Sequence, residues 1–133
     1  MGSDQLTRGI RVRVVPEYLP AASLPDDRLF YFDYYVTISN EGKHKVKLLS
    51  RHWVIINSEG ERREVRGPGV VGETPSLLPG ETFEYKSSCH LDTHWGTMEG
   101  TYRMKGMEGE EDKLFDVEIG RFFLVADVPE PAV

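Results

Sequence analysis

Three segments of this chain restrict its fold more than any others: LLSRHW (residues 48–53), EVRGPGVVGETPSLLPGETFEY (64–85) and GTMEGTYRM (96–104). Together they lie between Leu48 and Met104. Apolar side chains recur at every second position in the last segment and around Phe83 and Tyr85, whereas glycine and proline crowd the middle of the stretch. The pattern predicts β-strands on either side of an irregular loop.

The same period of two extends outward along the chain. Leu29–Ser39 is the clearest strand, since its aromatic and β-branched residues alternate between two faces. Val46–Asn57 is apolar on both faces at Trp53–Ile56, which predicts a central strand covered on both sides. The strands predicted cover residues 8–15, 29–39, 46–57, 61–66, 81–91, 97–107 and 114–125.

The connections are defined by glycine, proline and charge. Prolines at 16, 20 and 25 predict an irregular crossing after the first strand, and Glu108–Asp112 predicts an acidic hairpin tip. The apolar phase of the last strand slips at Gly120, which predicts a β-bulge. Because no segment has a sustained helical period, the sequence predicts an all-β fold: a two-sheet antiparallel sandwich of about seven strands.

Composition restricts the class of protein. The 133 residues carry 39% hydrophobic and 29% charged residues, which predicts one globular domain over residues 1–127 and a flexible tail over 128–133. The net charge of −6 argues against nucleic acid and anionic membranes as partners. With Cys89 as the single cysteine and no signal peptide in view, we expect a cytoplasmic protein. We also expect no cofactor.

The segment Gly67–Gly72 matches the pattern GxGxxG. That pattern binds pyrophosphate when a helix starts within it, and none is predicted here. Successive glycine amides can nevertheless form a concave anion site, and arginines lie just upstream. Turn geometry, with Val70 and Val71 anchoring the loop on the core, is the simpler explanation of the glycines. The candidate anion-binding residues are Gly67, Gly69, Gly72, Arg63 and Arg66.

The segment from Cys89 to Trp95 gathers residue types that bind metals. His90, Asp92 and His94 share one face of an extended strand, but the two imidazoles would then lie roughly 13 Å apart. One ion would reach both only if the chain bent sharply. These three residues are therefore weak candidates for a divalent-metal site. Cys89 is in phase with Phe83 and Tyr85, which predicts a buried core residue.

The order of these motifs resembles the ApaG domain family from about Phe30 to Leu124. The resemblance implies a fibronectin type III-like or immunoglobulin-like sandwich, a link to cobalt resistance and magnesium efflux, and contacts with other proteins. The residues that carry it include Arg51, His52, Trp53, Glu64–Gly67, Gly69–Gly72, Pro75, Leu78–Glu81, Leu91–Thr93, Gly96, Met98, Gly100, Tyr102 and Met104.

Function is predicted less sharply than fold. The first hypothesis is a non-enzymatic module that binds an unknown protein partner, because aromatic residues such as Tyr31, Tyr35 and Trp95 are expected at the surface. The alternative is a site for a phosphate-containing small molecule at the glycine loop, and direct metal binding is a minor third. An exposed edge strand would also allow two copies to pair as a homodimer.

Overall fold

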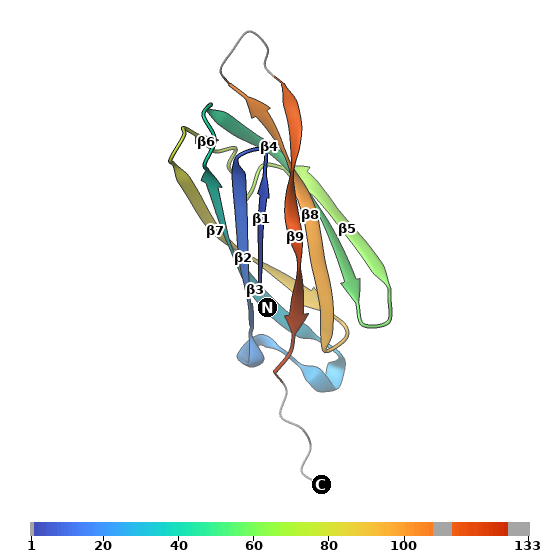
Figure 1. Ribbon diagram of the computed structural model, residues 1–133. Helices are drawn as coiled ribbons and strands as arrows, with labels where there is room; N and C mark the ends of the chain where they lie inside the picture. Colours follow the sequence, from blue (N-terminus) through green and yellow to red (C-terminus); the bar gives the residue numbers. More distant parts are fainter. Residues whose placement is uncertain (1, 108–112, 128–133) are drawn as a thin grey trace.

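The computed structural model describes residues 2–107 and 113–127 of the chain. This part forms two antiparallel β-sheets packed as a sandwich (Figure 1), so the predicted architecture is confirmed. The narrower likeness to fibronectin type III domains stays a prediction. The elements are β1 Ser3–Thr7, β2 Ile10–Tyr18, η1 Pro20–Ala22, η2 Pro25–Asp27, β3 Phe30–Asn40, β4 Val46–Asn57, β5 Arg62–Pro68, β6 Ser76–Leu77, β7 Thr82–Leu91, β8 Trp95–Gly106 and β9 Leu114–Val125.

The two flanks of the sandwich differ. The first sheet has the strand order β1-β2-β3-β7, and the second has β5-β4-β8-β9 with the short β6 also paired to β4. Strand β9 contacts β1 and β2 (Figure 1), and the Glu118 amide donates a hydrogen bond to Thr7 Oγ1 over 3.2 Å. That flank is closed. The remaining edge strands, β5 and β7, meet on the opposite flank, where Arg63 Nη2 donates to the His90 carbonyl over 2.8 Å.

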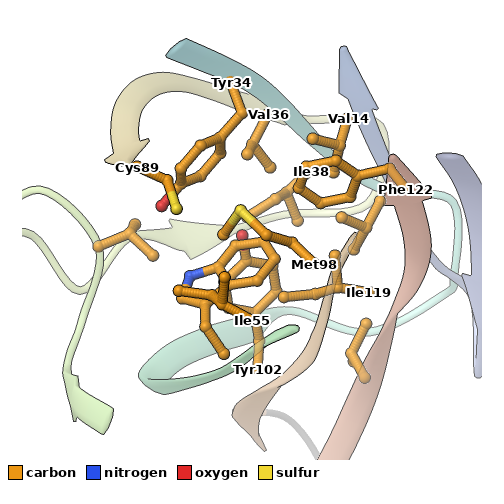
Figure 2. Close-up of a cluster of buried hydrophobic side chains, with 14 of the residues drawn as sticks. Val14, Tyr34, Val36, Ile38, Ile55, Cys89, Met98, Tyr102, Ile119 and Phe122 are labelled. Carbon is orange, nitrogen blue, oxygen red and sulfur yellow. The ribbon is translucent and has the colours of Figure 1, made fainter. Parts of the chain in front are cut away.

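The core lies between the sheets and is centred on aromatic rings. The Trp53 ring of β4 lies 5.2 Å from the Tyr34 ring of β3 and 5.9 Å from the Phe122 ring of β9, measured between centroids. In Figure 2, Tyr34 and Cys89 lie at one side of this core, while Val14 and Phe122 lie at the other. Burial of apolar surface is the main favourable contribution to folding, and each of these rings buries a large area.

The alternation predicted for the strands is largely confirmed. The inward residues of β3 are buried, as are those of β2 up to Val14 and Cys89 on β7, whereas Pro16 and Tyr18 at the end of β2 are partly buried. In β9, Gly120 and Arg121 lie opposite the single residue Glu99 of β8, so the predicted β-bulge is also present. The buried inward residues of β2 and β3 are Ile10, Val12, Val14, Phe30, Phe32, Tyr34, Val36 and Ile38.

Several local predictions were wrong. Strand β2 continues through Pro16 to Tyr18, because β1 pairs with residues 10–14 only and leaves Pro16 on an open edge where its missing N–H is tolerated. Strand β1 itself was not predicted. Strand β4 is central but covered on one face only, since Val54 and Ile56 stay partly exposed on the outer face of the sheet.

Other predicted features fall outside the described residues or concern membranes. The acidic tip 108–112 and the tail 128–133 lie outside the described residues, so neither prediction is tested. Within residues 2–107 and 113–127, the helices are too short to cross a lipid bilayer.

Candidate functional site

Backbone amides of the glycine loop donate hydrogen bonds within the protein. Gly67 is part of strand β5, and Gly69 and Gly72 both have a positive φ, +58° and +80°, which favours glycine at these two positions. The Gly69 amide donates to the Leu49 carbonyl over 2.8 Å, and the Val70 amide donates to the Glu73 carbonyl over the same distance. Turn geometry therefore accounts for these glycines, and the amides of Gly69 and Val70 are not available to an anion.

The loop is anchored on the core by one valine. Val70 is fully buried, as predicted, but Val71 is 54% exposed and has a φ of +44°. The tight bridge between Val70 and Glu73 turns the next side chain toward solvent, so the prediction that both valines cover the core was wrong for Val71.

Arg51, which was not among the predicted site residues, donates hydrogen bonds to this loop. Arg51 Nη1 donates to the carbonyls of Pro68 and Gly69 over 2.9 and 3.0 Å. A Cβ atom at Gly67 would lie 3.0 Å from Arg51 Nη1, so glycine at this position leaves room for the guanidinium. Because Gly67 has no side chain, the Arg51 guanidinium of the same chain can lie close to its backbone.

The structure does not bring Arg63 and Arg66 together. They are three residues apart on strand β5, and successive side chains of a strand alternate between faces. Arg66 lies on the outer face with Glu64, 3.6 Å from its carboxylate, and Glu64 also contacts His52 Nε2 over 2.7 Å. Arg63 points instead toward β7. The single anion site predicted from Arg63, Arg66 and the glycines is therefore divided between two faces of the sheet.

Arg63 lines a cleft on the open flank, between the edges of β5 and β7. This inter-sheet cleft has a volume of about 360 Å³, and its lining includes Tyr34, Arg51, Trp53, Arg63, Cys89 and His90. Arg63 Nη1 lies 3.3 Å from His90 Nε2, and Arg63 Nη2 lies 3.5 Å from Cys89 Sγ. Two guanidinium groups therefore reach the same hollow from strands β4 and β5.

Two titratable groups of the inter-sheet cleft, the Cys89 thiol and the Tyr34 hydroxyl, have raised pKa values that favour their neutral forms. Burial raises the pKa of the Cys89 thiol, and the nearby Arg63 guanidinium opposes this only in part. Burial likewise raises the pKa of Tyr34, against a hydrogen bond from Ser87 that lowers it. Because the thiolate is the reactive form of cysteine, Cys89 is suited to packing rather than to nucleophilic attack.

The three weak metal candidates have other partners or stand apart. Asn57 Nδ2 donates to Asp92 Oδ1 over 2.9 Å, and this bond lowers the pKa of Asp92. His90 faces the cation Arg63, which repels a metal ion. His94 contributes its backbone carbonyl as acceptor for the Ala126 amide. Among the residues that the structure describes, no group of three or more histidine, cysteine or acidic side chains is placed to hold a metal ion.

Comparison with known proteins decides the family. The family model of the ApaG domain matches residues 20–106. The chain belongs to the ApaG domain family. The protein named ApaG from Methylobacterium sp. strain 4-46 is 50% identical over 123 residues, which cover 92% of this chain and 91% of the relative. ApaG from Rhodospirillum centenum is 49% identical over 91% of each chain.

Solved structures agree with the ApaG assignment. The putative ApaA protein from Bordetella pertussis has a TM-score of 0.84 at 46% identity, covering 89% of this chain and 94% of that one. The C-terminal domain of wzt has a TM-score of 0.55 at 11% identity, over 97% of this chain and 80% of that domain. The second likeness concerns the fold alone, and the names of the ApaG relatives state no reaction or ligand.

Proposed function

We propose that this ApaG protein is a non-enzymatic binding module that engages a protein partner along the open flank of the sandwich. The observation that carries the proposal is that strands β5 and β7 each pair on one side only and end their sheets on that flank. Unpaired strand edges offer backbone groups to an extended segment of another chain, a common mode of peptide recognition. The opposite flank is closed by contacts between β1 and β9.

The charge of β5 favours a partner that differs from this chain. The strand carries three arginines and one glutamate, although the whole chain has a net charge of −6. Two copies of β5 would bring like charges together, which protects the edge against self-pairing. A neutral or acidic segment would meet no such repulsion. Homodimerisation through an exposed edge strand remains a separate prediction.

The buried Cys89 thiol at the inter-sheet cleft supports a role in binding without catalysis. The raised pKa of the Cys89 thiol keeps it protonated near neutral pH. The link to cobalt and magnesium that the family resemblance implies would then operate through the protein partner. A phosphate site at Gly67–Gly72 receives less support, because the amides of Gly69 and Val70 already donate hydrogen bonds to the carbonyls of Leu49 and Glu73.

Site-specific photo-crosslinking in cells tests the proposal even though the partner is unidentified. A photoreactive phenylalanine analogue replaces Val65 on β5 in one variant and Val15 on the outer face of β2 in the control; these valines are 37% and 61% exposed. We expect a discrete adduct from position 65 and none from position 15. Identical adducts from both positions, or none from position 65, would contradict the assignment of the open flank.

A further inference from the structure

Two arginines at the inter-sheet cleft have no hydrogen-bonded acidic partner among the described residues, although the charge of Arg63 also acts on Asp92, outside the cleft lining, and lowers its pKa. Neither Arg51 nor Arg63 forms an ion pair with a described carboxylate, and no described aspartate or glutamate lines the cleft. Their hydrogen bonds go to neutral groups, namely backbone carbonyls, His90 Nε2 and Cys89 Sγ. In contrast, seven arginines elsewhere in the described chain pair with acidic side chains: Arg11, Arg13, Arg28, Arg62, Arg66, Arg103 and Arg121. The cleft therefore concentrates positive charge without a bonded counter-ion in an acidic protein.

A third donor in the same lining lacks a partner. Trp53 is 2% exposed, and its indole Nε1 has no hydrogen-bond partner among the described residues. An unsatisfied buried N–H is uncommon and costs about 1–3 kcal/mol. An acceptor that entered the cleft would satisfy this donor and neutralise the two guanidinium groups. The indole N–H needs an acceptor and the guanidinium groups favour an anion, so a negatively charged oxygen would meet both requirements.

Part of the cleft wall is apolar, although Ser87 and Ser88 also line it. Ile55 and Met98 line it beside the indole ring of Trp53. Its volume of about 360 Å³ lies within the range of roughly 300–1,000 Å³ that is usual for small-molecule sites. The cleft thus offers cationic donors to one end of a ligand and an apolar surface to the rest.

We propose that the inter-sheet cleft binds a small organic oxyanion, a carboxylate or phosphate group attached to an apolar body. The arginines bind the oxygens with charge-assisted hydrogen bonds, the Trp53 indole donates a further bond, and the apolar body packs on Ile55 and Met98. This site is distinct from the glycine-loop site considered from sequence, since it uses Arg51 and Trp53 and none of the glycine amides. It also goes beyond the proposed function, because a free small molecule would bind with or without a protein partner.

The Trp53 indole proton is a direct reporter for this proposal. In a proton–nitrogen correlation spectrum, the two indole signals belong to Trp53 and Trp95, and Trp95→Phe identifies which is which. We expect phenyl phosphate or benzoate to move the Trp53 signal in a saturable manner and to leave the Trp95 signal, on the outer surface, unchanged. A response to phenyl phosphate alone would assign phosphate esters as the ligand class, and a response to benzoate alone would assign carboxylates. Inorganic phosphate should bind more weakly than phenyl phosphate, because it has no apolar body.

Arg63→Gln provides the decisive variant, and Arg62→Gln is its matched control on the outer face of the same strand. We expect Arg63→Gln to weaken binding of the responding probe by about tenfold or more, and Arg62→Gln to change it by less than about twofold, because charge-assisted bonds are lost only at position 63. The proposal is overturned if neither organic probe moves the Trp53 signal up to about 10 mM. Equal affinities for the two variants would overturn it as well, as would a response to phenyl phosphate whose affinity is no higher than that of inorganic phosphate.

Discussion

Glu64 shows how one side chain can connect three neighbours on a strand edge. Its carboxylate accepts a hydrogen bond from His52 Nε2 over 2.7 Å and lies 3.6 Å from both Arg62 and Arg66. The His52 bond is the largest of the effects that lower the pKa of Glu64, ahead of the two arginines. Strand alternation places Arg66 on the outer face of β5, away from the inter-sheet cleft, and this cluster supplies its acidic partner there.

The lowered pKa of Glu64 predicts a specific pH dependence. A carboxyl group whose pKa is lower in the folded state stabilises the fold above its unfolded pKa, near 4.5, and loses that contribution as the pH falls through the folded value. We expect His52→Gln to raise the pKa of Glu64 toward 4.5 and to reduce the loss of stability below that pH. Carboxyl NMR titration and urea unfolding check both effects, which should be small because the pair is exposed. An unchanged pKa of Glu64 in the variant would show that the arginines, and not His52, control it.

Strand elements followed from period-two patterns wherever one face is buried. Phe30–Asn40 alternates without interruption because its inward residues meet the second sheet, and its prediction was correct. Strand β1 could not be predicted, since none of its side chains is buried and its position depends on backbone pairing with β2. Burial of one face produces an alternating sequence pattern, as in β3. Main-chain hydrogen bonding, which holds β1 in place, produces no such pattern.

The sequence predicted Arg63 as a site residue, but the prediction that Arg66 joins it was wrong. The spacing of Arg63 and Arg66 already places them on opposite faces of any strand. The role of Arg51 could not be predicted from the sequence. Its acceptors are the backbone carbonyls of Pro68 and Gly69, and no sequence pattern indicates such bonds. Nor does the sequence reveal that the Trp53 indole N–H remains without a partner among the described residues.

Pairing between β4 and β8 depends on a glycine beside the bulge. An added Cβ at Gly100 would lie 2.0 Å from the His52 carbonyl oxygen, closer than two unbonded atoms can approach. We therefore expect Gly100→Ala to lower the free energy of unfolding by about 2 kcal/mol or more, because the backbones of the two strands must separate. Gly106→Ala on the same strand is the control, since its Cβ would meet only the Lys113 carbonyl oxygen at 3.9 Å. Urea denaturation should show a change within about 0.5 kcal/mol for the control, and equal effects of the two substitutions would refute the steric argument.

The sandwich as a single body is asymmetric. Its β1–β9 flank is closed by direct contacts between the sheets, whereas its β5–β7 flank exposes two strand edges and the inter-sheet cleft. The two sheets are nevertheless joined through one aromatic cluster, in which Trp53 contacts Tyr34 of the first sheet and Phe122 of the second. The open flank therefore provides a surface for ligands without dividing the core.

This shared cluster predicts that both sheets unfold together. Trp53 fluorescence reports the contact between the sheets, and far-ultraviolet circular dichroism reports the strands of both. In Trp95→Phe, where Trp53 is the single remaining tryptophan, we expect the two signals to give the same urea midpoint, because neither sheet can keep its buried face once Trp53 leaves Tyr34 and Phe122. A fluorescence transition that precedes the loss of circular dichroism would mean that the sheets separate before they unfold. The inter-sheet cleft would then belong to an element that opens independently of the rest of the domain.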